Sequence, residues 1–146
     1  MKKVYQNLPL PNVEFSRKLP KLVERMTMTT LTIEQLKELD VPVIVANQEG
    51  NVVDVNMHFE NVFGWSVQEI LGQPLTVILP AIFQDSHNLG FARFTATGNS
   101  TILNHPLLLK AVTKDGRELE SEHFIIAEKQ EGQWLFAATL RPLGIE

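Results

Sequence analysis

Two histidines, His87 and His123, are the side chains of this sequence best suited to hold a metal-centred cofactor. A neutral imidazole nitrogen is a common metal ligand, and it serves as an axial ligand of haem iron. His87 falls in a predicted long helix and His123 in a predicted strand, so two imidazoles could reach one iron from opposite sides. The alternative is that His87 only makes local hydrogen bonds. His58 and His105 are expected at the surface and at the start of a strand, and the four histidines lack a zinc spacing such as H-E-x-x-H.

Catalytic chemistry has little support. The sequence contains no nucleophile elbow, P-loop or G-x-G-x-x-G motif. Asp85, Ser86 and His87 are adjacent, but neighbours on a helix point in different directions and cannot converge as a catalytic triad. The chain has no cysteine, which excludes disulfides, thiolate metal sites, a catalytic thiol and a flavin–cysteinyl photoadduct. We therefore expect a protein that is not an enzyme.

Short helices and antiparallel strands must position these residues. Thr32 with Gln35 and Ser66 with Glu69 have capping-box spacing, which marks helix starts, and Gly64 has the position of a helix end. Gly-containing turns separate runs of alternating apolar residues, as in hairpins. These signals predict helices at 33–39, 57–63, 66–72 and 80–97, and strands at 42–45, 52–55, 107–113, 119–128 and 134–140.

Alternation along the strands predicts which side chains face the helices. Successive residues of a strand point to opposite faces, and Glu118, Glu120 and Glu122 are expected on the wet face. His123 therefore points inward. On the preceding strand, the charged Lys110 is expected to face water, so the odd-numbered residues of that strand are expected to point inward as well. The predicted inward sets are Leu119, Ser121, His123, Ile125 and Ala127 on one strand, Leu107, Leu109 and Ala111 on the second, and Trp134, Phe136, Ala138 and Leu140 on the last.

Residues 1–31 are expected to form an arm that precedes a single domain at 32–146. Three prolines interrupt the arm, and apolar residues recur at helical spacing from Leu19 to Met26, which predicts a short amphipathic helix. Short helices are marginally stable alone, so we expect this one to dock on the sheet or on a second subunit. A homodimer through this helix and the sheet face is the predicted assembly, with a signalling protein as a further partner.

Composition limits the remaining function classes. With 146 residues, 44% of them apolar, the chain fits one folded domain. The net charge of −4 and the lack of a basic run beyond Lys2 and Lys3 argue against nucleic acid as a partner. No apolar stretch approaches the roughly 20 residues that span a bilayer. We therefore expect a cytoplasmic protein without a membrane partner.

The segment VIVANQEGNVVDVNMHFENVFGWSVQEILGQPLTVILP, at 43–80, resembles the first half of PAS domains. In that family a hairpin is followed by Asn, by a helix ending in F-G-[YW] and by a [ST]-x-x-E-[LI]-[LI]-G helix. The segments SHNLGFARFTATGN and KDGRELESE resemble the haem-type branch found in oxygen-sensing nitrogen-fixation histidine kinases. His87 and Arg93 match that branch, whereas Leu107 stands where those proteins have an arginine near bound oxygen, and KDGRELE lacks the usual aromatic and proline residues.

The resemblance covers about 33–142 and implies an α+β fold. This PAS fold has a five-stranded antiparallel sheet with short helices on one face, and it encloses a pocket between the long helix and the sheet. The residues predicted to line the pocket are His87, His123, Phe91, Phe94, Ile102, Leu107, Leu109, Ser121, Ile125 and Phe136.

The implied function is a sensor that binds a small ligand or cofactor and relays a signal through a dimer or a partner protein. One candidate cofactor is haem, with His87 as axial ligand and His123 as the second metal ligand, and a flavin ranks below haem. Equally open is a cavity without a cofactor, which holds a metabolite or fatty acid or is filled by Phe91, Phe94, Phe124 and Trp134. The alternative function is a cofactor-free module for protein–protein interaction and dimerisation.

Overall fold

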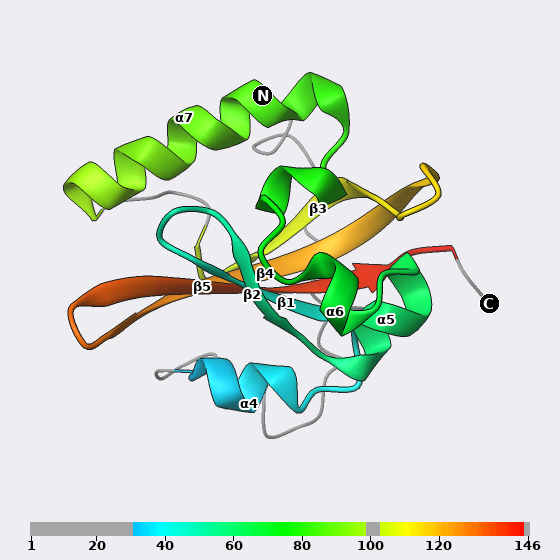
Figure 1. The fold of residues 1–146 in the computed structure, drawn as a ribbon, viewed down its shortest axis with the longest axis horizontal. Coiled ribbons are helices and arrows are strands. Elements are labelled where there is room, and N and C mark those ends of the chain that lie inside the picture. The colour runs from blue at the N-terminus through cyan, green and yellow to red at the C-terminus, as the bar shows by residue number, and fades with distance from the viewer. Residues whose placement is uncertain (1–30, 99–102, 145–146) are drawn as a thin grey trace.

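A computed structural model of the chain describes residues 31–98 and 103–144 (Figure 1). The predicted helix from Leu19 to Met26 and the predicted pocket residue Ile102 lie outside the described residues. The elements are α4 (Ile33–Lys37), β1 (Val43–Asn47), β2 (Val52–Val55), α5 (Met57–Phe63), α6 (Val67–Ile70), the 3-10 helix η1 (Leu75–Ile78), α7 (Ala81–Thr97), β3 (Pro106–Val112), β4 (Glu118–Gln130) and β5 (Gln133–Pro142). No helix in these two described ranges is long and apolar enough to cross a membrane.

The helix ends follow the local sequence signals. Thr32 Oγ1 accepts a hydrogen bond from the Gln35 amide at 3.1 Å, and the Gln35 side chain accepts one from the Thr32 amide at 2.9 Å. The same reciprocal pair joins Ser66 and Glu69 at the start of α6. Gly64 ends α5 at φ +82°, a conformation in which a side chain would be strained. Both predicted capping boxes are confirmed, whereas η1 was not predicted from the sequence.

The sheet has the order β2-β1-β5-β4-β3, and all neighbouring strands are antiparallel. β1 lies beside both β2 and β5, so Val43 pairs with Thr139 near the other end of the chain. The long hairpin of β4 and β5 forms the middle of the sheet, and β3 is an edge strand. His123 lies opposite Leu107 on β3, as the predicted inward sets require.

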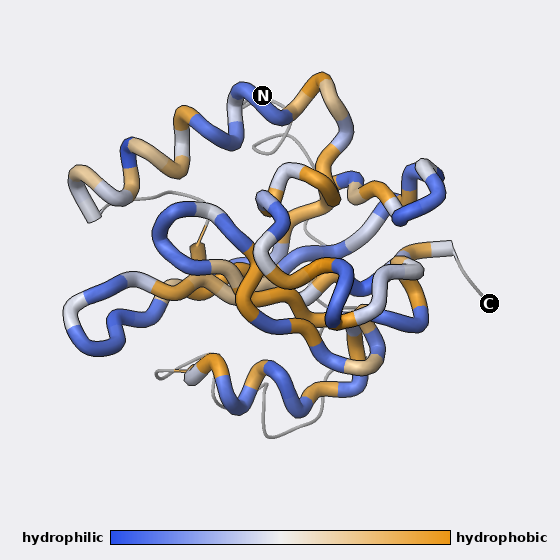
Figure 2. The backbone as a smooth tube through the Cα atoms, viewed as in Figure 1, coloured by the Kyte–Doolittle hydropathy of each residue, from blue (hydrophilic) through white to orange (hydrophobic). Residues whose placement is uncertain are grey.

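Each face of the sheet has its own hydrophobic core. On one face α5, α6 and η1 pack against Ile44, Val55, Ala111 and Leu140. On the other face α4 packs against Val43, Val45, Phe124, Ile126 and Ala137. Figure 1 shows α4 on the side of the sheet away from α7, and Figure 2 shows polar residues gathered at the β1–β2 and β4–β5 turns. The predicted fold class is confirmed, but α4 does not share a face with the other helices.

Two predictions for β4 are wrong because the second face of the sheet is covered. Glu122, expected on the wet face with Glu118 and Glu120, is fully buried. It forms an ion pair with Arg141, which lies directly opposite on β5. Phe124, expected as a possible filler of the cavity, is also even-numbered and therefore belongs to the core beneath α4.

Candidate functional site

The helix α7 is held to the sheet by aromatic side chains from its inner surface. The ring centroid of Phe91 lies 4.8 Å from that of Phe136 on β5. Phe94 contacts Phe136 at 5.2 Å and Trp134 at 4.9 Å, both edge to face. Such aromatic pairs each contribute about 0.5 to 1.5 kcal/mol beyond the burial of their surface. These four rings, named here the aromatic seam, connect α7 to the last strand.

Polar contacts fix the first turn of α7. The Gln84 side chain donates hydrogen bonds to the carbonyls of Thr76 at 3.1 Å and Leu79 at 3.2 Å. The outward side of the helix carries exposed apolar residues, including Ile82, 80% exposed, and Leu89, 68% exposed. The helix therefore rests on the rest of the domain along one narrow stripe, and a pocket opens beside that stripe.

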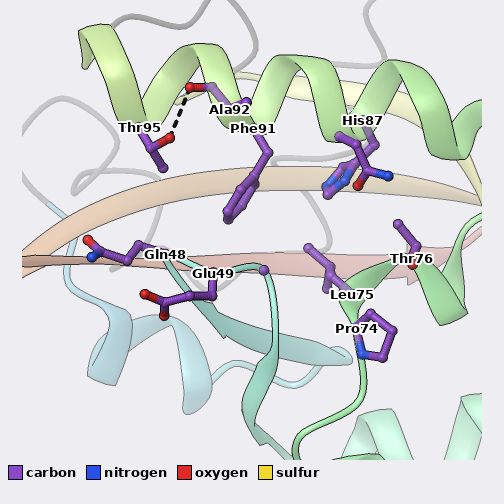
Figure 3. Close-up of a pocket in the computed structure, with 11 residues that line it drawn as sticks. Gln48, Glu49, Pro74, Leu75, Thr76, His87, Phe91, Ala92 and Thr95 are labelled. Carbon is purple, nitrogen blue, oxygen red and sulfur yellow. Dashed lines mark hydrogen bonds between the residues drawn. The ribbon is translucent and has the colours of Figure 1, made fainter.

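This pocket, of about 410 Å³, lies between α7, the β1–β2 turn and the segment that enters η1 (Figure 3). His87 and Phe91 project from α7 toward the turn and toward Leu75. Gly50 forms part of the wall at φ +85°, and a side-chain carbon there would lie 3.7 Å from the Phe91 ring. The lining residues are Gln48, Glu49, Gly50, Pro74, Leu75, Thr76, His87, Asn88, Phe91, Ala92 and Thr95.

His87 contributes a neutral imidazole to the pocket. Its ring is stacked near Phe91, with 5.7 Å between the ring centroids. Burial lowers the pKa of His87 from its ordinary value, and the neighbouring Asn88 side chain offsets part of that effect. The Nδ1 atom is buried and has no hydrogen-bond partner within the described part of the chain. Burying a polar atom without a hydrogen-bond partner costs free energy, so His87 Nδ1 is the atom of this pocket where a ligand would gain most from a hydrogen bond.

His123 lies in a different environment. The side chain is 3% exposed, and its Nε2 is 2.7 Å from Ser121 Oγ, which also donates to the Leu109 carbonyl. Burial lowers the pKa of His123 to about 3. The imidazole is therefore uncharged at neutral pH, and it is held by a neighbour on its own strand.

Replacing His123 with glutamine is expected to make stability depend less on pH. The unfolded chain protonates this histidine near its ordinary pKa of about 6.5, whereas the folded chain does so only near pH 3. Between these values the unfolded state binds one more proton, so the free energy of unfolding falls with falling pH by up to about 1.4 kcal/mol per pH unit. Urea unfolding at several pH values between about 5 and 7 measures this slope.

A Ser121→Ala variant serves as the control, because it removes the contact with Ser121 Oγ but keeps the titrating imidazole. Its pH slope should stay close to that of the wild type, even if the protein is less stable. An unchanged slope in the His123→Gln variant would show that His123 does not remain neutral in the folded protein.

Only part of the predicted pocket lining gathers around this pocket. His87 and Phe91 line it, and Phe94 and Phe136 lie next to Phe91 in the aromatic seam. The remaining described candidates share the inward face of β3 and β4 but are not lining residues: His123, Leu107, Leu109, Ser121 and Ile125. Of the other histidines, His58 lies 3.0 Å from Asp40 at the surface, as expected, and His105 precedes the first residue of β3, also as expected, and is exposed.

The arrangement of His87 and His123 decides whether a haem can be held between them. Two-histidine ligation requires His87 and His123 to face one space, but only His87 lines the pocket, and His123 Nε2 is hydrogen-bonded to Ser121. The contacts of Phe91 and Phe94 with Phe136 occupy space between α7 and the middle of the sheet. The residues as placed do not fit a haem held between the two histidines.

Several lining residues were not predicted from the sequence. Glu49 lies in the β1–β2 turn and Thr76 in η1, and neither position predicts a wall shared with α7. On α7, by contrast, Ala92 and Thr95 lie four and seven residues after Asn88, so these three residues form one stripe along a helix. This stripe adjoins the one that carries His87 and Phe91, so the helical part of the lining could have been found from the sequence.

Comparison with known proteins identifies the family. A family model described as PAS domain matches residues 40–141. The chain belongs to the PAS domain family. PAS domains are generally sensory modules without catalytic activity, and the family match agrees with the predicted PAS fold.

Individual relatives agree with this assignment. An uncharacterized protein of Azorhizobium caulinodans is 33% identical over 102 residues, which are 69% of this chain and 14% of the relative. The matched region is thus a small part of that longer protein. A PAS domain from Desulfitobacterium hafniense superimposes with a TM-score of 0.60 at 17% identity, covering 75% of this chain and 99% of that one. The PAS domain of an HTR-like protein from Haloarcula marismortui gives 0.58 at 17% identity, covering 84% and 93%.

Proposed function

We propose that this PAS domain is a small-molecule sensor whose ligand occupies the pocket between α7 and the β1–β2 turn. The observation that carries the proposal is the buried Nδ1 of His87, which has no hydrogen-bond partner among the described residues. A ligand that supplies this hydrogen bond gains free energy, because a buried polar atom without a partner is costly. Phe91 adds a flat apolar surface beside it, and polar groups with an aromatic wall are typical of small-molecule sites.

The route of the signal follows from the double role of Phe91. This residue lines the pocket and also contacts Phe136 in the aromatic seam. A ligand that moves Phe91 therefore acts on β5, which is bonded to both β1 and β4. We propose that the sheet passes this change to a partner protein or to a second copy of the chain, with the predicted helix at Leu19 to Met26 as the dimer contact.

The same experiment must distinguish two alternative functions. One is a bound haem or flavin, where haem would use His87 alone, since this histidine faces the pocket. The other is an interaction module without any ligand, whose pocket is a by-product of how α7 packs. The measurement must therefore report binding at this pocket and distinguish small polar ligands from cofactors.

The test is a thermal unfolding screen with a mixed panel of amines, amides, carboxylates, purines, hemin and FMN. At least one small polar compound is expected to raise the unfolding temperature of the wild type, because a ligand that binds only the folded state stabilises it. The effect should disappear in Ala92→Trp, whose larger side chain fills the pocket. Ala96→Trp is the matched control, because Ala96 is exposed on α7 but does not line the pocket.

Three results would contradict the proposal. If no compound raises the unfolding temperature, the interaction module without a ligand is favoured. Stabilisation that persists in Ala92→Trp would place the ligand elsewhere. Stabilisation by hemin, with a Soret band that is lost in His87→Ala, would make the protein a haem sensor instead.

A further inference from the structure

The charge of the pocket narrows the class of ligand. Among the residues that line it, Glu49 is the one with a full charge, because burial keeps His87 neutral and the remaining lining residues are uncharged. Glu49 lies on the β1–β2 turn, across the pocket from α7 (Figure 3). Electrostatics alone therefore favour a cation over an anion.

The hydrogen-bonding groups of the lining residues also favour a cation, because several of them are acceptors that suit a ligand rich in donors. Thr95 Oγ1 already donates its proton to the Ala92 carbonyl at 2.9 Å, so it has acceptor capacity to offer. The Glu49 carboxylate is an acceptor as well, and a neutral His87 can accept at Nδ1 when its proton is on Nε2. The Gln48 side-chain oxygen accepts from the Trp134 amide at 3.1 Å, so Gln48 offers the pocket its NH2 group, while the Asn88 side chain can both donate and accept.

The aromatic wall adds a shape requirement. Phe91 presents its ring beneath α7 with the imidazole of His87 stacked beside it. A flat group can pack against these rings, and a flat cation gains an additional attraction to an aromatic face.

We propose that the pocket selects small, flat cations rich in hydrogen-bond donors, such as amidinium or protonated amino-heterocycle groups. This proposal rests on the proposed function. The Glu49 carboxylate sets the preference for positive charge. Phe91 and His87 set the preference for a flat group, and Thr95 accepts a further hydrogen bond.

Three probes of nearly equal shape isolate the charge: benzamidine, which is cationic at neutral pH, benzamide, which is neutral, and benzoate, which is anionic. Each is titrated into the ¹⁵N-labelled full chain, and the dissociation constant is taken from amide chemical shifts. Benzamidine is expected to bind roughly fivefold more tightly than benzamide, as a partly exposed ion pair and a cation–ring contact allow, with benzoate the weakest. The shifted amides should include those of the β1–β2 turn and of α7 near Phe91.

Glu49→Gln should reduce the affinity for benzamidine to about that for benzamide, whereas Glu131→Gln, in the exposed turn after β4, should leave the order unchanged. Equal binding of all three probes, blocked by Ala92→Trp, would overturn the charge preference while the pocket itself stands. Binding that survives Ala92→Trp would overturn the pocket and the proposed function together. Failure of all three probes to bind, while another compound of the thermal screen binds at this pocket, would overturn the ligand class alone.

Discussion

Replacing Arg141 with methionine is expected to lower the free energy of unfolding by about 3 to 5 kcal/mol. Arg141 is paired with Glu122 across neighbouring strands, and Glu122 has no exposed surface. Removing the guanidinium leaves a carboxylate in the covered face of the sheet without this charge partner. A buried charge is unfavourable in such surroundings, so the cost falls on the folded state. Urea unfolding at neutral pH measures the change.

Two further variants separate the burial of this pair from its charge. Lys110→Met breaks a surface ion pair with Glu118, whose atoms are 3.8 Å apart, and should cost less than about 1 kcal/mol. The double variant Glu122→Leu with Arg141→Met removes both charges and should be clearly more stable than Arg141→Met alone. If the double variant is no more stable, the loss in the single variant comes from packing and not from removing the charge partner of Glu122.

Replacing Asn56 with alanine is expected to cost about 2 to 4 kcal/mol. The side-chain oxygen accepts hydrogen bonds from the amides of Val43 and Phe59, both at 3.0 Å. The side-chain nitrogen donates to the carbonyl of Val41 at 2.8 Å and to that of Lys37 at 3.3 Å. One amide thus joins the end of α4, the start of β1 and the first turn of α5. Alanine leaves all four backbone groups without this partner, and thermal or urea unfolding reports the loss.

The chain offers a matched control for Asn56. Asn47 also accepts two backbone hydrogen bonds, from Glu49 and Asn51, but it does so in the β1–β2 turn and connects no separate elements. Asn47→Ala should cost about 1 kcal/mol. Asn56→Asp keeps the oxygen and loses the donor, so it should lie between the two. Equal losses at both positions would mean that the connecting role of Asn56 adds nothing to stability.

The sequence predicted those features that depend on short spacings. Capping at Thr32 and Ser66 joins residues three apart, and the inward side of His123 follows from counting along one strand. Hairpin turns are likewise local. For this reason the order and type of nearly all elements could be predicted, with η1 as the exception.

Features that depend on distant contacts could not be predicted. The burial of Glu122 depends on Arg141 and on a face of the sheet that is covered, and neither is visible in the alternation of β4 itself. The pocket joins Glu49 on a turn to His87 on α7, although 38 positions separate 49 from 87 in the sequence. Strand parity likewise placed His123 on the correct face, but it could not show whether that face opens into the pocket at this position.

The position of β1 between β2 and β5 affects how the protein is made. β1 needs β5 as a neighbour, with Val43 paired to Thr139, so the ribosome must synthesise almost the whole domain before this side of β1 can be bonded. Contacts this far apart in sequence are slow to form, because a long loop must close first. Until then the nascent chain carries the β1–β2 hairpin with an unpaired edge, which is a surface prone to aggregation. Synthesis that stalls within β4 would therefore leave the hairpin exposed for chaperones to protect.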